Sequence, residues 1–146
     1  MLSWLISDPL PAGTPAPDFS LPDDSGRMVT LSAMRGRSVV LVFYPGDDTP
    51  GCTTQLCEFR DSWDAAKSRN VAVFGVNPQS AQSHTKFRGK FHFPFPILVD
   101  RGQKVAALYH ANGIIVKRTV YLVGPDGSIR YSQRGKPSPA EVLALA

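Results

Sequence analysis

Apolar residues are grouped along the chain in short runs of the kind that form β-strands. Residues 39–44 (V-V-L-V-F-Y) and 71–76 (V-A-V-F-G-V) are almost continuously apolar and rich in β-branched side chains. Such runs are typical of strands that are buried on both faces of a parallel sheet. Residues 97–99 form a shorter run of the same kind, which ends at Asp100. The first two thirds of the chain therefore predict strands covered by helices.

Helical patterns alternate with these strands. Ser32 can cap a short helix that ends at Gly36. Near the C-terminus, S-P-A-E at residues 138–141 supplies an N-cap, a proline at the first helical position and a glutamate three residues after the cap. This signal starts a terminal helix. Three further segments are predicted to be helical: from about Cys52 to about residue 69, residues 80–91, and residues 104–109.

Two antiparallel hairpins complete the pattern. Residues 19–21 and 28–31 flank the turn P-D-D-S-G-R, and residues 118–123 and 129–132 flank G-P-D-G. Strands that alternate with helices early and pair as a hairpin late predict an α/β fold. We expect a central mixed β-sheet flanked by helices, with an N-terminal β-hairpin.

Length and composition place the chain among ordinary globular proteins. Of its 146 residues, 42% are hydrophobic and 19% are charged, so one core of normal size can form. We expect a single domain over residues 1–146, of which 1–17 form an N-terminal arm with an extended, proline-rich second half. Four apolar residues of the arm either pack on their own domain or make a dimer contact: Leu2, Trp4, Leu5 and Ile6.

The first ten residues do not predict a signal peptide. They contain no basic residue, and Asp8 and Pro9 interrupt a short apolar run. No stretch approaches the ~18 apolar residues of a membrane span. A cytoplasmic protein without a membrane partner is therefore expected.

The net charge of +4 is unevenly distributed. Residues 86–136 hold ten Lys and Arg but only Asp100 and Asp126 as acids. A basic half can indicate nucleic-acid binding, yet these cations are spread over several predicted elements and form no binding motif. We therefore expect no nucleic-acid partner, and we interpret the basic half as a solvated face that attracts an acidic redox partner.

Other polar residues give no sign of a metal site or a cofactor. Three histidines lack metal-ligand spacing and are interpreted as ordinary residues, and three carboxylates near the cysteines are interpreted as a solvated rim. These residues are His84, His92, His110, Asp47, Asp48 and Glu58.

The candidate chemistry lies after the strand at 39–44. The chain's two cysteines, Cys52 and Cys57, follow a turn that contains two prolines and two glycines. Cys52 falls at or within the first turn of the predicted helix, where unpaired backbone N–H groups and the helix dipole stabilise a thiolate. Because the thiolate is the attacking form, this position predicts a nucleophile.

The spacing of the two cysteines restricts their chemistry. On one regular helix, residues five apart have Cα atoms about 8.6 Å apart, whereas a disulfide needs ~4.4–6.8 Å. The bond cannot form while such a helix is intact. We therefore expect that a disulfide requires the first turn of the helix to unwind.

The residues around Cys52 resemble a known family. Pro45, Thr49 and Cys52 form P-x-x-x-T-x-x-C, the signature of the peroxiredoxins, and T-P-G-C-T-T-Q-L-C-E-F-R-D is similar to the Q-type or bacterioferritin comigratory protein subfamily of the AhpC/TSA superfamily. The resemblance extends from about residue 11 to the C-terminus. It implies a thioredoxin-like fold and a thiol peroxidase without a cofactor or metal.

The resemblance implies a role for each motif residue. Cys52 is the peroxidatic nucleophile, which reduces hydrogen peroxide or an organic hydroperoxide and becomes a sulfenic acid. Thr49 directs its hydroxyl at the thiolate or the peroxide, and Pro45 shields the sulfur from water. Backbone N–H groups near Gly51 and Cys52 bind the substrate.

The resemblance also points to Arg118 as the cation of the site, because a guanidinium can hold the sulfur and a peroxide oxygen together. Lys117 is the alternative cation, since strand alternation lets only one of the two face the site. Gln55 departs from the family pattern, because many relatives carry Glu at this place. Gln can accept a hydrogen bond from Arg118 but supplies no charge.

The resemblance implies that Cys57 is the resolving cysteine of an atypical 2-Cys enzyme and forms the Cys52–Cys57 disulfide. A thioredoxin-type dithiol then reduces this disulfide. A buried structural thiol is the alternative for Cys57. A monomer or weak homodimer is expected. Two other functions stay open: a disulfide reductase, which usually carries C-x-x-C, and a non-catalytic binding module on the same fold.

Overall fold

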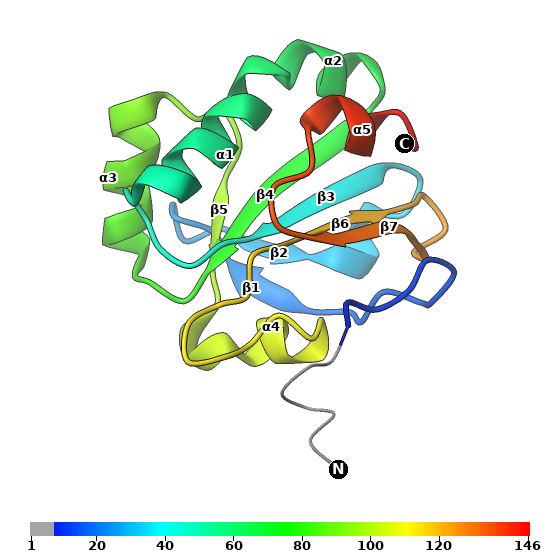
Figure 1. Ribbon diagram of the computed structural model, residues 1–146, viewed down its shortest axis with the longest axis horizontal. Coiled ribbons are helices and arrows are strands. Elements are labelled where there is room, and N and C mark those ends of the chain that lie inside the picture. Colours follow the sequence, from blue (N-terminus) through cyan, green and yellow to red (C-terminus); the bar gives the residue numbers. More distant parts are fainter. Residues whose placement is uncertain (1–7) are drawn as a thin grey trace.

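A computed structural model describes residues 8–146 of the chain. Its centre is a five-stranded sheet in the order β5-β4-β3-β6-β7 (Figure 1). β3 pairs in parallel with β4, and β4 with β5, whereas β6 is antiparallel to both β3 and β7. The strands are β3 (Ser38–Phe43), β4 (Val71–Asn77), β5 (Ile97–Val99), β6 (Thr119–Val123) and β7 (Ile129–Arg134). A separate antiparallel hairpin of β1 (Ser20–Pro22) and β2 (Met28–Thr30) precedes them.

Helices cover both faces of the sheet. The α-helices are α1 (Pro50–Asp61), α2 (Trp63–Ser68), α3 (Ala81–Phe91), α4 (Lys104–Leu108) and α5 (Pro139–Leu143), and two 3₁₀ turns are η2 (Leu31–Met34) and η3 (Arg101–Gln103). Figure 1 shows α1, α2, α3 and α5 on one side of the sheet and α4 with the hairpin on the other.

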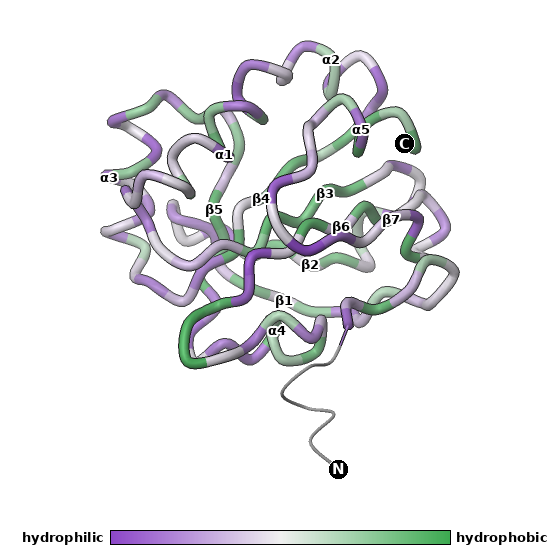
Figure 2. Tube along the Cα trace, viewed as in Figure 1, coloured by the Kyte–Doolittle hydropathy of each residue, from purple (hydrophilic) through white to green (hydrophobic). Residues whose placement is uncertain are grey.

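Two apolar clusters fill the two sides of the sheet. Val40 and Val42 of β3 belong to the cluster under α1, α2, α3 and α5, whereas Val39, Leu41 and Phe43 belong to the cluster next to α4 and the hairpin. This alternation is the period of two that a strand imposes on its side chains. The green tube along β3, β4 and β6 in Figure 2 follows the same buried strands. The predicted mixed sheet, its flanking helices and the N-terminal hairpin are confirmed.

The helix predicted from about Cys52 to about residue 69 is two helices in the structure. It begins at Pro50 and is interrupted at Ser62, which has φ −100° and ψ 12° and separates α1 from α2. Serine is unfavourable in the interior of a helix, because its side chain forms hydrogen bonds with nearby backbone groups in non-helical conformations. After the break, the ring of Trp63 lies 6.3 Å from that of Phe95, so tertiary packing favours the change of direction.

The predicted cap at Ser32 is wrong. The 3₁₀ turn begins at Leu31, so Ser32 lies inside it, and its N–H donates to Asp18 Oδ1. Hydrogen bonds from Ser32 hold the pKa of Asp18 below its usual value. A carboxylate from a distant part of the chain thus replaces the local cap. Gly36 follows the turn with φ +96°, as a helix-terminating glycine does.

Three expectations from the sequence keep the status of predictions. The apolar residues Leu2, Trp4, Leu5 and Ile6 lie outside the described residues, and the single-domain organisation and the cytoplasmic location stay predictions. Within residues 8–146, no helix is both long and apolar enough to cross a membrane.

Candidate active site

The start of α1 is built around Cys52. Thr49 is the N-cap residue with extended backbone angles (φ −92°, ψ 148°), and Pro50 occupies the first helical position, where a missing N–H costs no hydrogen bond. The first intrahelical bond joins Thr53 N to Thr49 O at 2.8 Å. The N–H groups of Gly51 and Cys52 therefore precede the hydrogen-bonded part of the helix and are available to an anion.

Arg118 lies directly against the sulfur of Cys52. Its Nη2 is 3.4 Å from Cys52 Sγ, although the two residues are 66 positions apart. The antiparallel register pairs Phe43, the last residue of β3, with Thr119, the first residue of β6. The residue before β6 is thereby brought to the edge of the sheet from which the loop to α1 leaves. Arg118 occupies this position. It is therefore Arg118, and not Lys117, whose side chain contacts Cys52.

Gln55 connects three segments of the site. Its Oε1 accepts from Arg118 Nη1 at 2.8 Å, and its Nε2 donates to Gly135 O at 3.3 Å. The N–H of Gly135 in turn donates to Arg118 O at 2.8 Å. The side chain of Gln55 is buried, so this carboxamide holds the guanidinium without neutralising it. Among residues 8–146, no ion pair involves Arg118.

A second cation, Lys136, was missed by the sequence analysis. A Cβ atom placed on Gly51 would lie 3.2 Å from Arg118 Nη2 and 3.4 Å from Lys136 Nζ. Both cations thus converge beside Gly51, and a side chain at that position would make them shift slightly. Lys136 follows β7, and no motif or spacing in the sequence connects it with Cys52.

Thr49 and Pro45 lie in the loop between β3 and α1. The hydroxyl of Thr49 donates to Gly46 O at 2.9 Å, which closes the loop and leaves the lone pairs of the oxygen free to accept a further hydrogen bond. Thr49 is exposed and Pro45 is partly exposed.

Cys57 has different surroundings from Cys52. Both thiols are free, but Cys52 is fully buried and Cys57 only partly. Burial raises the pKa of Cys57, and the nearby Arg60 partly opposes this change. Both residues lie on the unbroken helix α1, Pro50–Asp61, so the regular-helix Cα separation of about 8.6 Å applies and the disulfide requires a change in the helix.

The interpretation of Asp47 as part of a solvated rim was wrong, because its carboxylate pairs with the buried side chain of His84. Their side chains are 3% and 0% exposed, and Asp47 Oδ2 lies 2.6 Å from His84 Nδ1. The sequence suggested a solvated rim because it does not show that the loop folds back onto α3. Asp48 and Glu58 are exposed as predicted. In residues 8–146, no group of three or more His, Cys, Asp or Glu side chains is arranged to hold a metal ion.

Comparisons with known proteins agree with this geometry. The sequence profile of the AhpC/TSA family matches residues 12–132. The chain belongs to the AhpC/TSA family. Among curated members, the chain is 44% identical over 126 residues to "Peroxiredoxin Bcp" of Bacillus subtilis (strain 168), with 80% of each chain covered. It is 39% identical over 131 residues to "Peroxiredoxin Q, chloroplastic" of Oryza sativa subsp. japonica, which covers 87% of this chain.

Solved structures of family members share the fold. Peroxidoxin BcpB from Mycobacterium tuberculosis superposes with a TM-score of 0.85 and 30% identity, over 92% of this chain and 94% of that chain. The bacterioferritin comigratory protein of Xanthomonas campestris gives 0.82 and 25%, over 92% and 94%. The predicted thioredoxin-like fold and the Q-type resemblance are thus confirmed. The chain spans about 60% of the length of the rice AhpC/TSA relative.

Proposed function

We propose that the protein is a thiol peroxidase that reduces hydroperoxides through Cys52 and Cys57. One observation carries the proposal: Cys52 Sγ is buried in the first turn of α1, 3.4 Å from the guanidinium of Arg118. A buried sulfur at a helix N-terminus beside a permanent cation is suited to be a thiolate. A purely structural cysteine would have no use for this cation.

In the first step, the thiolate of Cys52 attacks the terminal oxygen of the hydroperoxide. A sulfur–oxygen bond forms, the O–O bond breaks, and the leaving RO⁻ takes up a proton to give an alcohol, or water from H₂O₂. Arg118 and the N–H groups of Gly51 and Cys52 stabilise the negative charge that moves from the sulfur to the leaving oxygen. The Thr49 hydroxyl accepts the hydroperoxide O–H, and Pro45 limits access of water.

In the second step, Cys57 resolves the sulfenic acid. Its thiolate attacks Cys52 Sγ, a disulfide forms, and the hydroxyl leaves as water after protonation. Because the helix holds the two cysteines too far apart, at least the first turn of α1 must open before this attack. An external dithiol of the thioredoxin type then reduces the disulfide to the two thiols. The bacterioferritin comigratory protein of Xanthomonas campestris is described as having alkyl peroxide reduction activity, which supports an organic hydroperoxide as one substrate.

Stoichiometric oxidation of the reduced protein tests the proposal. The chain has two tryptophans, so a Trp4→Phe variant reports on Trp63 alone, next to the helix that must rearrange. We expect one equivalent of hydroperoxide to remove both thiols and to change Trp63 fluorescence within seconds. A disulfide reductase would respond only to added disulfides, and a binding module to neither reagent. Either of these results would exclude the peroxidase.

A further inference from the structure

The loop between β3 and α1 is tied to α3 by a polar cluster whose centre, the side chains of Asp47 and His84, is buried. Asp47 Oδ2 accepts from Ser83 Oγ at 2.7 Å and contacts His84 Nδ1 at 2.6 Å, while Asp47 Oδ1 accepts from the hydroxyl of Tyr44 at 2.5 Å. The N–H of Asp47 donates to Gln79 Oε1 at 2.6 Å. Both carboxylate oxygens and the backbone of this single residue are therefore held. We call Tyr44, Asp47, Asn77, Gln79, Ser83 and His84 the loop anchor.

Both ring nitrogens of His84 face oxygen atoms. Nδ1 faces the Asp47 carboxylate, and Nε2 lies 3.2 Å from the carbonyl oxygen of Asn77. A carbonyl oxygen only accepts, so the bond to Asn77 requires Nε2 to donate. Burial acts to raise the pKa of Asp47, but hydrogen bonds from His84, Tyr44 and Ser83 outweigh it and lower the pKa. Both side chains are buried and each is held by the other, so removing either one leaves a polar group without its partner in the interior.

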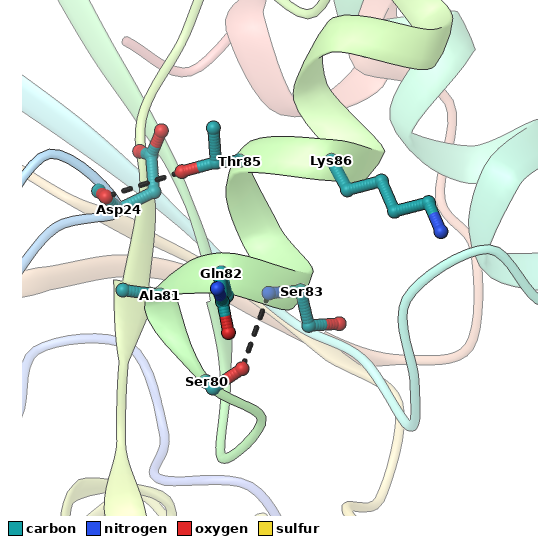
Figure 3. A pocket seen from close by; sticks show the side chains of 7 residues that line it. All are labelled: Asp24, Ser80, Ala81, Gln82, Ser83, Thr85 and Lys86. Carbon is teal, nitrogen blue, oxygen red and sulfur yellow. Dashed lines mark hydrogen bonds between the residues drawn. The ribbon is translucent and has the colours of Figure 1, made fainter.

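The anchor also includes the end of β4. Asn77 Nδ2 donates to Tyr44 O at 2.8 Å, and Asn77 Oδ1 accepts from Gln79 N at 2.8 Å. The first turn of α3 is capped by Ser80, whose Oγ accepts from Ser83 N at 3.1 Å. Figure 3 shows this cap from the side of the open groove outside α3. The helix that carries Ser83 and His84 is therefore itself fixed at its start.

The segment bonded to α3 ends at Asp48, one residue before the N-cap of α1. Asp48 has φ +57°, a left-handed conformation that is uncommon for a non-glycine residue, and its side chain pairs with Lys90 of α3 at 2.8 Å. Thr49 is already the N-cap of α1. Residues up to 48 are thus bonded to α3, whereas the next residues belong to the helix turn that must open for the disulfide to form.

We propose that Asp47 and His84 are positioning residues that form the fixed end of the hinge on which the first turn of α1 opens and closes. The proposal rests on the proposed peroxidase function. While Cys52 moves toward Cys57, the anchor keeps residues 44–47 on α3 and β4. After reduction it fixes the path by which Thr49 and Cys52 return to Arg118, so peroxide reduction needs the anchor and disulfide formation does not.

Hydrogen exchange on the wild-type chain tests the hinge without any substitution. The Cys52–Cys57 disulfide is formed with diamide, so this arm does not depend on peroxidase activity. We expect amides of residues 53–57 to lose at least tenfold in protection, while the Asp47 amide stays within about threefold and the ¹⁵N shifts of the His84 ring are the same in both redox forms. Loss of Asp47 protection in the oxidised form, or a change in the His84 ring ¹⁵N shifts, would overturn the proposal.

Variants separate the two chemical steps. His84→Asn retains a donor toward Asp47 but loses the bond to Asn77, and Asp47→Asn removes the carboxylate. His92→Asn, at the exposed end of the same helix, is the matched control. In stopped flow with H₂O₂, we expect both anchor variants to lose at least tenfold in the rate of Cys52 oxidation and to form the disulfide within twofold of the wild-type rate. Equal effects on both steps, or no effect on either, would contradict the hinge, whereas an inert wild type would contradict only the peroxidase function.

Discussion

The two cysteines lie on one helix yet in opposite surroundings. Cys52 is in the first turn of α1, fully buried and beside Arg118, and Lys136 lies next to the preceding residue, Gly51. Cys57 is further along the helix, partly buried, and its pKa is raised by burial. One region therefore stabilises a negative sulfur, and the other favours a neutral thiol.

On the proposed function, this difference gives the order of the two steps. Peroxide reacts first with Cys52, the sulfur that lies at the helix N-terminus beside the guanidinium of Arg118. Cys57 on this proposal attacks only after α1 opens, because the intact helix holds the two sulfurs apart.

Serine substitutions at the two cysteines are expected to have the largest effects on peroxide consumption. Cys52→Ser is expected to abolish peroxide consumption, because a hydroxyl is not ionised at neutral pH even beside a cation. Cys57→Ser is expected to leave one turnover and then to stop with a sulfenic acid on Cys52, which dimedone traps. Steady-state turnover of Cys57→Ser at the wild-type rate with thioredoxin as reductant would remove Cys57 from the mechanism.

Removing the cation reduces the contrast between the two thiols. Arg118→Met preserves most of the side-chain length without its charge and is expected to slow Cys52 oxidation about 100-fold, the usual effect of losing one donor to a developing negative charge. Lys117→Met is the matched control, since it removes the neighbouring cation. A larger loss in the Lys117 variant than in the Arg118 variant would reverse the assignment.

The pH dependence of disulfide formation follows from the thiol of Cys57. Burial raises the pKa of Cys57 in the intact helix, and after α1 opens the pKa returns toward the ~8.5 of a free thiol, so in both states the thiolate fraction at neutral pH is small and grows with pH. We expect the rate of the second step to rise about tenfold per unit between pH 6 and 8, whereas the first step changes less. A second step that is independent of pH in this window would show that opening of α1, not attack by sulfur, limits it.

Gln55→Glu tests how the charge of the residue that holds Arg118 affects the oxidation of Cys52. A carboxylate at this position pairs with Arg118 and draws its charge away from the sulfur, and it cannot donate to Gly135 O as Gln55 Nε2 does. We expect Cys52 oxidation to slow about fivefold, in keeping with the loss of one buried hydrogen bond. Faster oxidation would mean that tighter holding of Arg118 matters more than its neutralisation. Single-turnover kinetics measure either outcome.

The smallest effect is expected from Lys136. Its side chain is exposed, and exposed charges contribute roughly 0.2–1 kcal/mol to an interaction. Lys136→Gln should slow Cys52 oxidation about twofold to fivefold, and the difference should shrink at high ionic strength. Lys104→Gln, an exposed lysine on α4, is the control. The same loss in both variants would indicate a general charge effect.

The sequence predicted the parts of this site that depend on local pattern. The apolar run at 39–44 and the proline–glycine turn placed Cys52 in the first turn of a helix, and the family motif pointed to Arg118. The pairing of Asp47 with His84 and the approach of Lys136 escaped prediction, because each depends on how a loop folds onto a distant segment. The break at Ser62 was missed for a related reason, since the packing of Trp63 on Phe95 overrides the helical periodicity.

The distance along the chain between Cys52 and Arg118 has a consequence for the newly made protein. Synthesis proceeds from the N-terminus, so the cysteine leaves the ribosome 66 residues before the arginine that contacts it. Until β6 is complete and pairs with β3, the nascent polypeptide holds Cys52 without its contact to Arg118. If the proposed function holds, the peroxide-reducing site is therefore assembled only when the chain has folded.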